Sequence, residues 1–335
     1  MYYPMTIHRN ISEINTEQWK QLIDNSSVAS FFQTPECYDF YASMSFLKPF
    51  VFGVSENEKL AGLVCGYLIA DGGKIMQFYS RRAIIQGGFL LDENISEIAL
   101  QLLLKTCINE LNNKAIYIET RNCSDFSKFR STIEKSGFCY QRHLNFHIKT
   151  ENIESAYAQL SSTKRRDIKI SKKSGVETVE LKTKDEITEF YTILQNLYKT
   201  KIRVPLFPVE FFEKFVSFDG NKILGIKYDG KIIGGSVCTC WNNVVYEWFV
   251  CGKDGDLKNI YSSTIATWNS IVYAVESGCG YLDMLGAGKP EKDYGVRDFK
   301  AKFGGELVEY GRFLYVCDNF LYRIGKFYIE KIRLL

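Results

Sequence analysis

The expected helices and strands follow the same order in both halves of this chain. This repeat constrains the fold more than any other feature. Residues 50–70 carry two apolar runs around a short polar turn, and residues 221–241 carry the same pattern around Asp229-Gly230. Aligned without gaps, three identities lie 225 − 53 = 172 positions apart: Gly53 with Gly225, Lys59 with Lys231, and Gly62 with Gly234. The sequence therefore predicts two domains of one topology.

The length of the chain agrees with two domains, because 335 residues exceed what one hydrophobic core normally supports. We expect the first domain over residues 1–150 and the second over 151–335. The second begins with a basic helical connector at 151–175 and ends with a basic helix at 318–335. The net charge of +3 is too small to attract nucleic acid through overall charge, so no DNA partner is expected.

The ten cysteines and three histidines do not indicate a disulfide framework or a metal site. Most of the cysteines are scattered through apolar runs, and only Cys238 and Cys240 lie close together. We therefore expect free thiols in a reducing compartment and no bound metal. The first ten residues lack the pattern of a signal peptide, and no apolar run approaches the ~20 residues of a transmembrane helix. These features predict a cytoplasmic protein.

Each half is expected to form an α/β (α+β) domain, with a mixed, mostly antiparallel sheet flanked by helices. The second half reads as a strand, two helices, three antiparallel strands, a helix, a strand, a helix and a closing strand pair. In the first half, the hairpin is followed by expected strands at 74–79 and 81–86. Ligands of such sheets bind where the strand order breaks, which in the second half lies at the ends of strands 244–251 and 281–285.

This order resembles the GNAT acyltransferase fold, and two copies in one chain resemble the Fem family of peptidyltransferases. The strongest local similarity is DYGVRDFKAKFGGELVEY at 293–310, with Gly295, then Phe299-Lys300, then Phe303-Gly304 before a strand. Phe32-Gln33-Thr34-Pro35 and the basic run 163–176 also resemble family segments. The resemblance covers essentially the whole chain. It implies tandem GNAT-like domains that transfer amino acids from aminoacyl-tRNA to peptidoglycan precursors.

Two departures from the family pattern concern the substrates. Where the family places a Trp and then a Lys that holds a nucleotide-linked precursor, this chain has Cys37 and then Phe40 and Tyr41. The Gln/Arg-x-x-Gly-x-Gly/Ala loop by which GNAT enzymes hold the CoA pyrophosphate is also absent between residues 251 and 265. Both aminoacyl-tRNA and acyl-CoA remain candidate co-substrates, and no tightly bound cofactor is expected.

Three residues are candidate catalytic groups. The resemblance implies that Lys300 stabilises charge developing at the reacting ester, and the alternative is a solvated helix Lys. Asp283 lies within the apolar run 281–285, so its carboxylate requires a partner, either structural or the acceptor's nucleophile. Glu247, between Tyr246 and Trp248, is the alternative base, because a desolvated carboxylate has a raised pKa.

Three further residues are candidate substrate contacts. Arg203 lies in the loop 199–208, which in the resembling proteins covers the acceptor, and its guanidinium suits a carboxylate or phosphate. Tyr294 is expected at the pocket mouth. Phe299 and Phe303 are four residues apart, so the spacing favours a core face over a substrate platform, and Phe299 is the candidate for the latter.

Two basic segments suggest polyanionic partners. The run 164–173 is either a solvated helix face or a contact for tRNA or another polyanion. In the end helix, basic Arg323, Lys326, Lys331 and Arg333 alternate with apolar residues, which is compatible with a peripheral membrane contact, although docking on the second domain is favoured.

The sequence therefore predicts an acyltransferase that moves an acyl or aminoacyl group onto an amine or hydroxyl of a cell-envelope precursor, peptidoglycan or surface polysaccharide. Two alternatives stay open. One is an acyl-CoA-dependent N-acetyltransferase acting on a sugar or small molecule. The other is a non-catalytic binding protein on the same scaffold.

Overall fold

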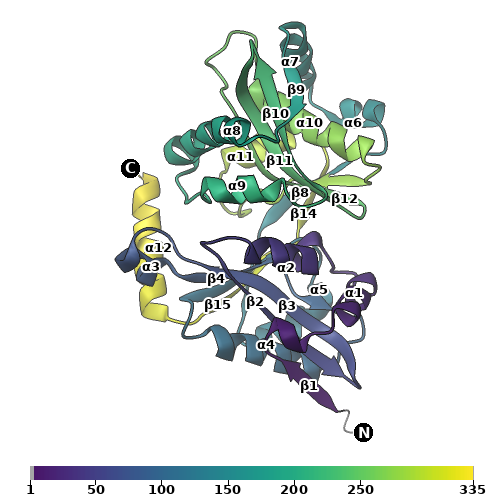
Figure 1. Cartoon of the computed structure of the whole chain (residues 1–335), viewed down its shortest axis with the longest axis vertical. Coiled ribbons are helices and arrows are strands. Elements are labelled where there is room, and N and C mark those ends of the chain that lie inside the picture. The colour runs from purple at the N-terminus through teal and green to yellow at the C-terminus, as the bar shows by residue number, and fades with distance from the viewer. Residues whose placement is uncertain (1–3, 335) are drawn as a thin grey trace. The chain divides into compact units, whose positions relative to one another are not determined.

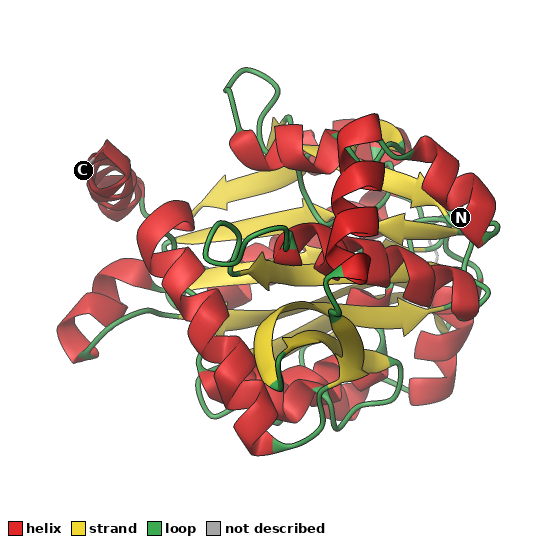
Figure 2. Ribbon diagram, turned by 90° about the horizontal axis from the view of Figure 1, so that it is seen from above, coloured by secondary structure: helices red, strands yellow, loops and turns green. Residues whose placement is uncertain are grey.

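A computed structural model of the chain describes the backbone of residues 4–334 and the side chains through Phe327 (Figure 1). The chain folds into two compact units, each built around one sheet. Unit 1 comprises the residues up to Arg142 together with those from Tyr310 onward, and unit 2 comprises His143–Glu309. Both units mix helix and strand, and strands in Figure 2 are flanked by helices. The predicted mixed α/β architecture is confirmed.

Unit 1 contains a sheet with the strand order β1-β2-β3-β4-β6-β15-β7, and β5 pairs with β3. Its strands are β1 (Met5–His8), β2 (Lys48–Glu56), β3 (Lys59–Ile69), β4 (Arg82–Gly87), β5 (Leu90–Leu91), β6 (Tyr117–Asn122), β7 (Cys139–Gln141) and β15 (Arg312–Val316). Its α-helices are α1 (Thr16–Asp24), α2 (Pro35–Ala42), α3 (Lys74–Ser80), α4 (Glu97–Leu111), α5 (Ser127–Lys135) and α12 (Asn319–Leu334).

Unit 2 contains a sheet with the strand order β14-β8-β13-β12-β11-β10-β9. Its strands are β8 (Leu144–Lys149), β9 (Glu177–Glu180), β10 (Asn221–Tyr228), β11 (Lys231–Trp241), β12 (Val244–Gly252), β13 (Tyr281–Asp283) and β14 (Glu306–Glu309). Its α-helices are α6 (Ile153–Gln159), α7 (Ser162–Lys173), α8 (Lys184–Leu197), α9 (Val209–Phe215), α10 (Ser262–Glu276) and α11 (Gly295–Ala301).

The sequence repeat corresponds to two hairpins with the same register. In β2–β3, Gly53 faces Leu63 and the register shifts between Val54 and Ser55. In β10–β11, Gly225 faces Gly235 and the shift falls between Ile226 and Lys227, again 226 − 54 = 172 positions later. Both turns use residues with positive φ, which suits the twist of a tight hairpin. The two halves therefore share the position of a β-bulge as well as the order of elements.

The chain exchanges its closing strands between the units. β7 stays in the sheet of unit 1, whereas β8, only a few residues later, pairs with β13 and β14 of unit 2. Conversely, β15, which follows unit 2 in the sequence, pairs with β6 and β7 in the sheet of unit 1. Each sheet thus contains, next to its edge strand β7 or β14, one strand contributed by the other half of the sequence.

This exchange corrects the predicted domain boundaries. We placed the division at residue 150 and assigned residues 318–335 to the second domain. The structure moves the division to 142/143, because the backbone of β8 completes the sheet beside β13. It also assigns α12 to unit 1, where this helix contacts α3. Pairing between distant strands is invisible to local sequence patterns, which explains the error.

The strand predicted at residues 74–79 is wrong, because these residues form helix α3. In the sheet, β3 pairs directly with β4 through Tyr67–Ile69 and Arg82–Ile84, so no position remains for a strand between them. The segment is instead looped out after Gly72-Gly73 as one short helix.

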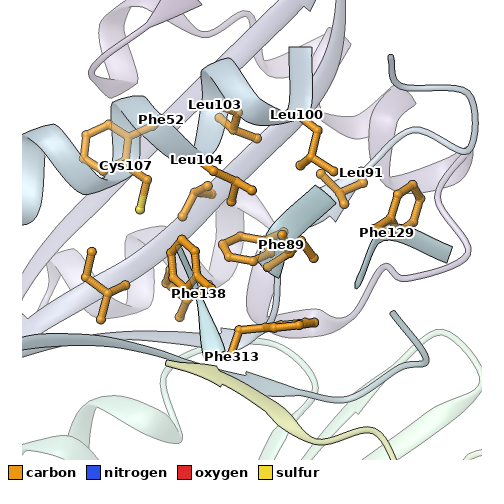
Figure 3. Packing of buried hydrophobic residues seen from close by; sticks show 14 of the residues in the cluster. Phe52, Phe89, Leu91, Leu100, Leu103, Leu104, Cys107, Phe129, Phe138 and Phe313 are labelled. Atoms are coloured by element: carbon orange, nitrogen blue, oxygen red, sulfur yellow. The ribbon is translucent and has the colours of Figure 1, made fainter. Parts of the chain in front are cut away.

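Aromatic and aliphatic side chains from both ends of the sequence form the core of unit 1 (Figure 3). The Phe89 ring centroid lies 5.7 Å from that of Phe138 and 6.4 Å from that of Phe313. Phe313, on the exchanged strand β15, is fully buried, and its backbone N–H donates to Thr120 Oγ1 at 2.8 Å. The core that forms under α4 is therefore completed by a residue that follows all of unit 2 in the sequence.

The substitution Phe313→Ala is expected to destabilise unit 1 by about 3–5 kcal/mol, because it empties a buried aromatic site. Hydrogen exchange should speed up in β6 and leave β10 and β11 unchanged. Leu307→Ala, at a half-exposed position on β14, is the matched control and should shift stability by less than about 0.5 kcal/mol. Faster exchange spread equally over β6 and β10 would contradict the assignment of β15 to the core of unit 1.

Candidate active site

The sheet of unit 2 opens where β12 and β13 part. The two strands pair in parallel only from Val244 to Tyr246, opposite Tyr281 to Asp283. Beyond this point β12 continues to Gly252, and among the described strands none pairs with it on this side. A β-bulge changes the direction of β12 at the same place. Val237 faces Phe249 and Cys238 faces Glu247, so the register skips Trp248 between them. The sheet therefore splays beside Glu247 and Asp283.

Among the described residues of unit 1, the corresponding strands show no such opening. The parallel pair of unit 1, β4 with β6, stays in register from Ala83 to Gly87, opposite Ile118 to Asn122. This pairing covers all of β4 after its first residue. The repeat is thus symmetric in topology but only its second copy carries an open sheet of this kind.

Lys300 lies in the opening. It is on α11, and its side chain is buried, with 7% of its surface exposed. The Nζ atom donates hydrogen bonds to the carbonyl oxygens of Met284 and Gly286, the latter at 2.7 Å. Left-handed backbone at Leu285 (φ 49°) and Gly286 (φ 102°) turns these two carbonyls towards the amine. Burial lowers the pKa of Lys300, while Glu247 and Asp283 oppose this by favouring the cation.

Asp283 ends β13 and is fully buried, with partners on three sides. Its Oδ1 accepts hydrogen bonds from Asn145 Nδ2 at 2.6 Å and from the backbone N–H of Leu285 at 2.7 Å. Its Oδ2 lies 3.2 Å from His147 Nε2. Of the two roles considered for Asp283, the structure supports the structural one, because its carboxylate joins β8 to the loop that holds Lys300.

Glu247 is the second buried carboxylate of the site, with 3% of its surface exposed. Its Oε1 accepts a hydrogen bond from Ser270 Oγ at 2.9 Å, and its Oε2 has no hydrogen-bond partner among the described residues. Burial raises its pKa, against the opposing effects of Lys300, Ser270 and Thr267. A carboxylate of this kind has one oxygen held in place and one able to take a proton.

The other predicted residues lie around this centre in different ways. Tyr294 caps α11, is 39% exposed, and has its ring against the backbone of Gly288. Phe299 is half-buried, and its ring centroid lies 5.1 Å from that of Phe303, so it packs against the core of the unit. Arg203 is exposed, with left-handed backbone (φ 55°) after the helical turn Tyr198–Ile202. The structure shows no hydrogen bond or ion pair of Arg203 with the triad Lys300, Asp283 and Glu247.

Sequence reasoning missed several polar residues of the site. Asn145 and His147 reach Asp283 from β8, which we had assigned to the first domain. Ser270 is held on the buried face of α10, where its Oγ lies 2.8 Å from Ser236 Oγ. The available signal was the spacing of Ser262, Thr267 and Ser270, which places small hydroxyls among the apolar residues of one helix.

Lys164 is a further buried cation that was treated only as part of a basic run. Its Nζ donates to Thr264 Oγ1 at 2.7 Å and lies 4.0 Å from the ring centroid of Phe299 and 4.8 Å from that of Phe303. Burial lowers its pKa to about 8. Lys164 thereby ties α7 to α10 and to the helix that carries Lys300.

The N-terminus of α10, where a GNAT enzyme would hold pyrophosphate, is already occupied. Asp254 Oδ1 accepts from the backbone N–H of Ser263 at 3.0 Å. The end of β12 also packs closely here, since a Cβ on Gly252 would collide with the same amide. A carboxylate at the positive end of a helix disfavours a second anion.

The early Phe-Gln-Thr-Pro segment is structural. Gln33 is buried and its Nε2 donates to Gly88 O at 3.1 Å, while Thr34 caps α2 through the N–H of Cys37. Phe40 and Tyr41, at the positions where the family places a Lys, are almost completely buried.

Comparison with known proteins agrees with this geometry. Residues 225–329, which include β11, β12, β13 and Lys300, match the model of the FemAB family. Among solved structures, FemX superposes with a TM-score of 0.69 at 12% identity, over 96% of this chain and 99% of that one.

This chain has the Fem-type tandem GNAT fold. A tandem GNAT protein from the clavulanic acid biosynthesis pathway is similar with a TM-score of 0.61 at 9% identity, over 94% of this chain and 99% of its own. The C-terminal domain of a putative lysylphosphatidylglycerol synthetase from Agrobacterium fabrum is similar with a TM-score of 0.59 at 11% identity, over 93% of this chain and 94% of its own. No curated protein sequence matches the chain. The FemAB match indicates acyltransferase activity.

Replacing Glu247 should change how the stability of this protein depends on pH. Because the folded-state pKa of Glu247 is raised above about 4.5, its contribution is present below that pH and is lost as pH rises through the folded pKa. The wild type should therefore lose up to about 1.4 kcal/mol per pH unit relative to Glu247→Gln in that window. Urea unfolding of both proteins at several pH values measures the difference.

Glu276→Gln, at the exposed end of α10, controls for the loss of one acidic side chain. Its stability should follow that of the wild type across the same pH range. Parallel curves for the wild type and Glu247→Gln would show that Glu247 is ionised at no cost in the folded protein.

Proposed function

We propose that this protein transfers an aminoacyl group from aminoacyl-tRNA to an amine or hydroxyl of a cell-envelope precursor. The observation that carries the proposal is the position of Lys300, a buried cation in the one open parallel pair of the two sheets, within the segment that matches the FemAB family. A fixed positive charge in a site with little water stabilises negative charge that develops during acyl transfer.

In the proposed reaction, the acceptor nitrogen or oxygen attacks the ester carbonyl carbon of the aminoacyl group. The Lys300 ammonium stabilises the resulting oxyanion. Glu247 Oε2 takes the proton that the nucleophile loses, and this proton then passes to the ribose oxygen as the ester C–O bond breaks. The raised pKa of Glu247 suits a base that must take up and return a proton.

Asp283 is proposed as a positioning residue. Its carboxylate holds the N–H of Leu285, between the two carbonyls that bind Lys300. Removing it would loosen the loop that orients the amine, rather than remove a proton acceptor.

Two observations favour tRNA over acyl-CoA as the donor. Asp254 occupies the N-terminus of α10, where a CoA pyrophosphate would otherwise be held. In addition, α7 presents Lys169, Lys172 and Lys173 around a groove of about 500 Å³ that also includes Tyr157 and Trp268. These three Lys side chains are exposed on one side of α7, and an exposed basic row suits the phosphates of an RNA strand.

The acceptor is proposed to be an envelope precursor that does not need the Lys of the family's first domain. Phe40 and Tyr41 are buried in α2 and offer no cation to a nucleotide-linked precursor. Arg203, exposed on its loop, is the proposed contact for an acceptor anion, and Tyr294 and Phe299 are proposed to line the approach to Lys300.

Lys300→Met is expected to lower transfer by at least about 10²-fold, because it removes the charge that stabilises the oxyanion. Removing the cation leaves the carbonyls of Met284 and Gly286 without its hydrogen bonds, so stability should fall, and circular dichroism checks that the variant is folded under the assay conditions. The assay follows labelled amino acids from a charged tRNA pool into an envelope extract. Lys302→Met, at the exposed neighbouring Lys, is the control and should retain activity. Unchanged turnover in Lys300→Met would remove this residue from the mechanism.

Replacing Lys169, Lys172 and Lys173 together by Gln should weaken binding of charged tRNA and reduce the slope of log K against log salt by about 2–3. Gel mobility at several salt concentrations measures both effects. Gln at Lys20, Lys48 and Lys105, exposed positions of unit 1, gives the same change in charge elsewhere. Equal loss in both triple variants would assign the effect to net charge, and thermal stabilisation by acetyl-CoA alone would contradict the tRNA donor.

A further inference from the structure

Helix α3 exposes its large apolar side chains instead of burying them. The exposed fractions are 78% for Ile75, 46% for Met76, 52% for Phe78 and 46% for Tyr79, and no residue of the helix is buried. A helix looped out of the sheet with these residues gains no stability from a core. Exposed apolar side chains gathered on one short helix are typical of a surface that contacts another molecule.

Helix α12 adds a second exposed apolar face beside the first. Phe320, Ile324 and Phe327 are 73%, 43% and 61% exposed, and their spacing places them on one side of the helix. Leu321, in contrast, is buried. The two helices contact each other within unit 1 and lie side by side in Figure 1. We call the exposed apolar residues of these two helices the α3/α12 patch: Ile75, Met76, Phe78, Tyr79, Phe320, Ile324 and Phe327.

The charged residues of the two segments that carry the α3/α12 patch, 74–81 and 319–327, are all basic, and acidic Asp71 and Asp318 flank these segments. Lys74 begins α3 and Arg81 follows it, with the guanidinium of Arg81 4.2 Å from the ring centroid of Phe78. On α12, Arg323 and Lys326 are exposed. No acidic residue occurs in 74–81 or in 319–327. Aromatic and aliphatic side chains bordered by Lys and Arg are the composition of surfaces that lie in the headgroup region of a bilayer.

We propose that the α3/α12 patch docks this protein on the surface of an anionic phospholipid bilayer. The apolar side chains enter the boundary between headgroups and acyl chains, and Lys74, Arg81, Arg323 and Lys326 contact lipid phosphates. None of the helices among residues 4–334 is long and apolar enough to cross a membrane. The side chains of Lys331 and Arg333, also named in the sequence, lie outside the described residues.

Charge favours a bilayer over a second copy of the chain as the occupant. A two-fold contact through the patch would bring the basic residues of both copies together, without acidic residues in these segments to pair with them. An anionic lipid surface supplies the complementary charge on every side. The inference does not depend on the proposed transfer reaction, because vesicle binding requires neither donor nor acceptor.

The test is flotation of the full chain with vesicles of phosphatidylcholine alone or with about 30% phosphatidylglycerol, at low and high salt. The wild type should float with the anionic vesicles and lose binding as salt rises. The double variant Phe78→Ser, Phe320→Ser should bind about tenfold more weakly. Ile98→Ser, which replaces a 66% exposed side chain of α4, is the matched control and should bind as the wild type does.

Three outcomes would overturn the proposal. They are no flotation of the wild type, equal flotation of the wild type and the double variant, and concentration-dependent dimers in light scattering that the double variant abolishes. The last result would identify a second copy as the occupant. Circular dichroism of each variant confirms that the exposed substitutions leave the fold intact.

Discussion

The ammonium group of Lys300 lies where β12 and β13 part, and the geometry of unit 2 around it depends on keeping that charge satisfied. A cation buried to this degree is stable only with close acceptors, which the carbonyls of Met284 and Gly286 supply at hydrogen-bond distance. Left-handed backbone at Leu285 and Gly286 is needed to present them. Asp283 accepts a hydrogen bond from the backbone N–H of Leu285 and so holds the same loop. The end of β13, the loop conformation and the buried charge therefore depend on one another.

The same arrangement distinguishes the two halves of the chain, which share a topology. In unit 1 the parallel pair β4–β6 stays in register from Ala83 to Gly87, opposite Ile118 to Asn122. In unit 2 the bulge in β12 and the short β13 open the pair, and Glu247 is desolvated at the point of opening. A duplicated scaffold with one open copy allows the other to provide surfaces for positioning, such as the α3/α12 patch.

The strand exchange makes the site of unit 2 and the core of unit 1 each depend on a strand from the other half of the sequence. β8 carries Asn145 and His147 to Asp283, and β15 carries Phe313 into the core of unit 1. Neither half of the sequence can complete its own sheet. Folding of the site residues in unit 2 is therefore coupled to a strand that precedes the connector helices, and the core under α4 is coupled to the last strand of the chain.

The sequence by itself determined the repeat and the tandem α/β fold, and it singled out Asp283 and Glu247, because hairpin turns, apolar periodicity and a charged residue within an apolar run are local signals. The resemblance to the Fem family singled out Lys300. Only the tertiary structure decided the boundary at residue 142/143, the partners of Asp283, the closure of α10 by Asp254 and the helix at 74–80. Each of these depends on which strand pairs with which, or on contacts between residues far apart in the chain. Such contacts are set by the packing of whole elements, and no local pattern of residues encodes them.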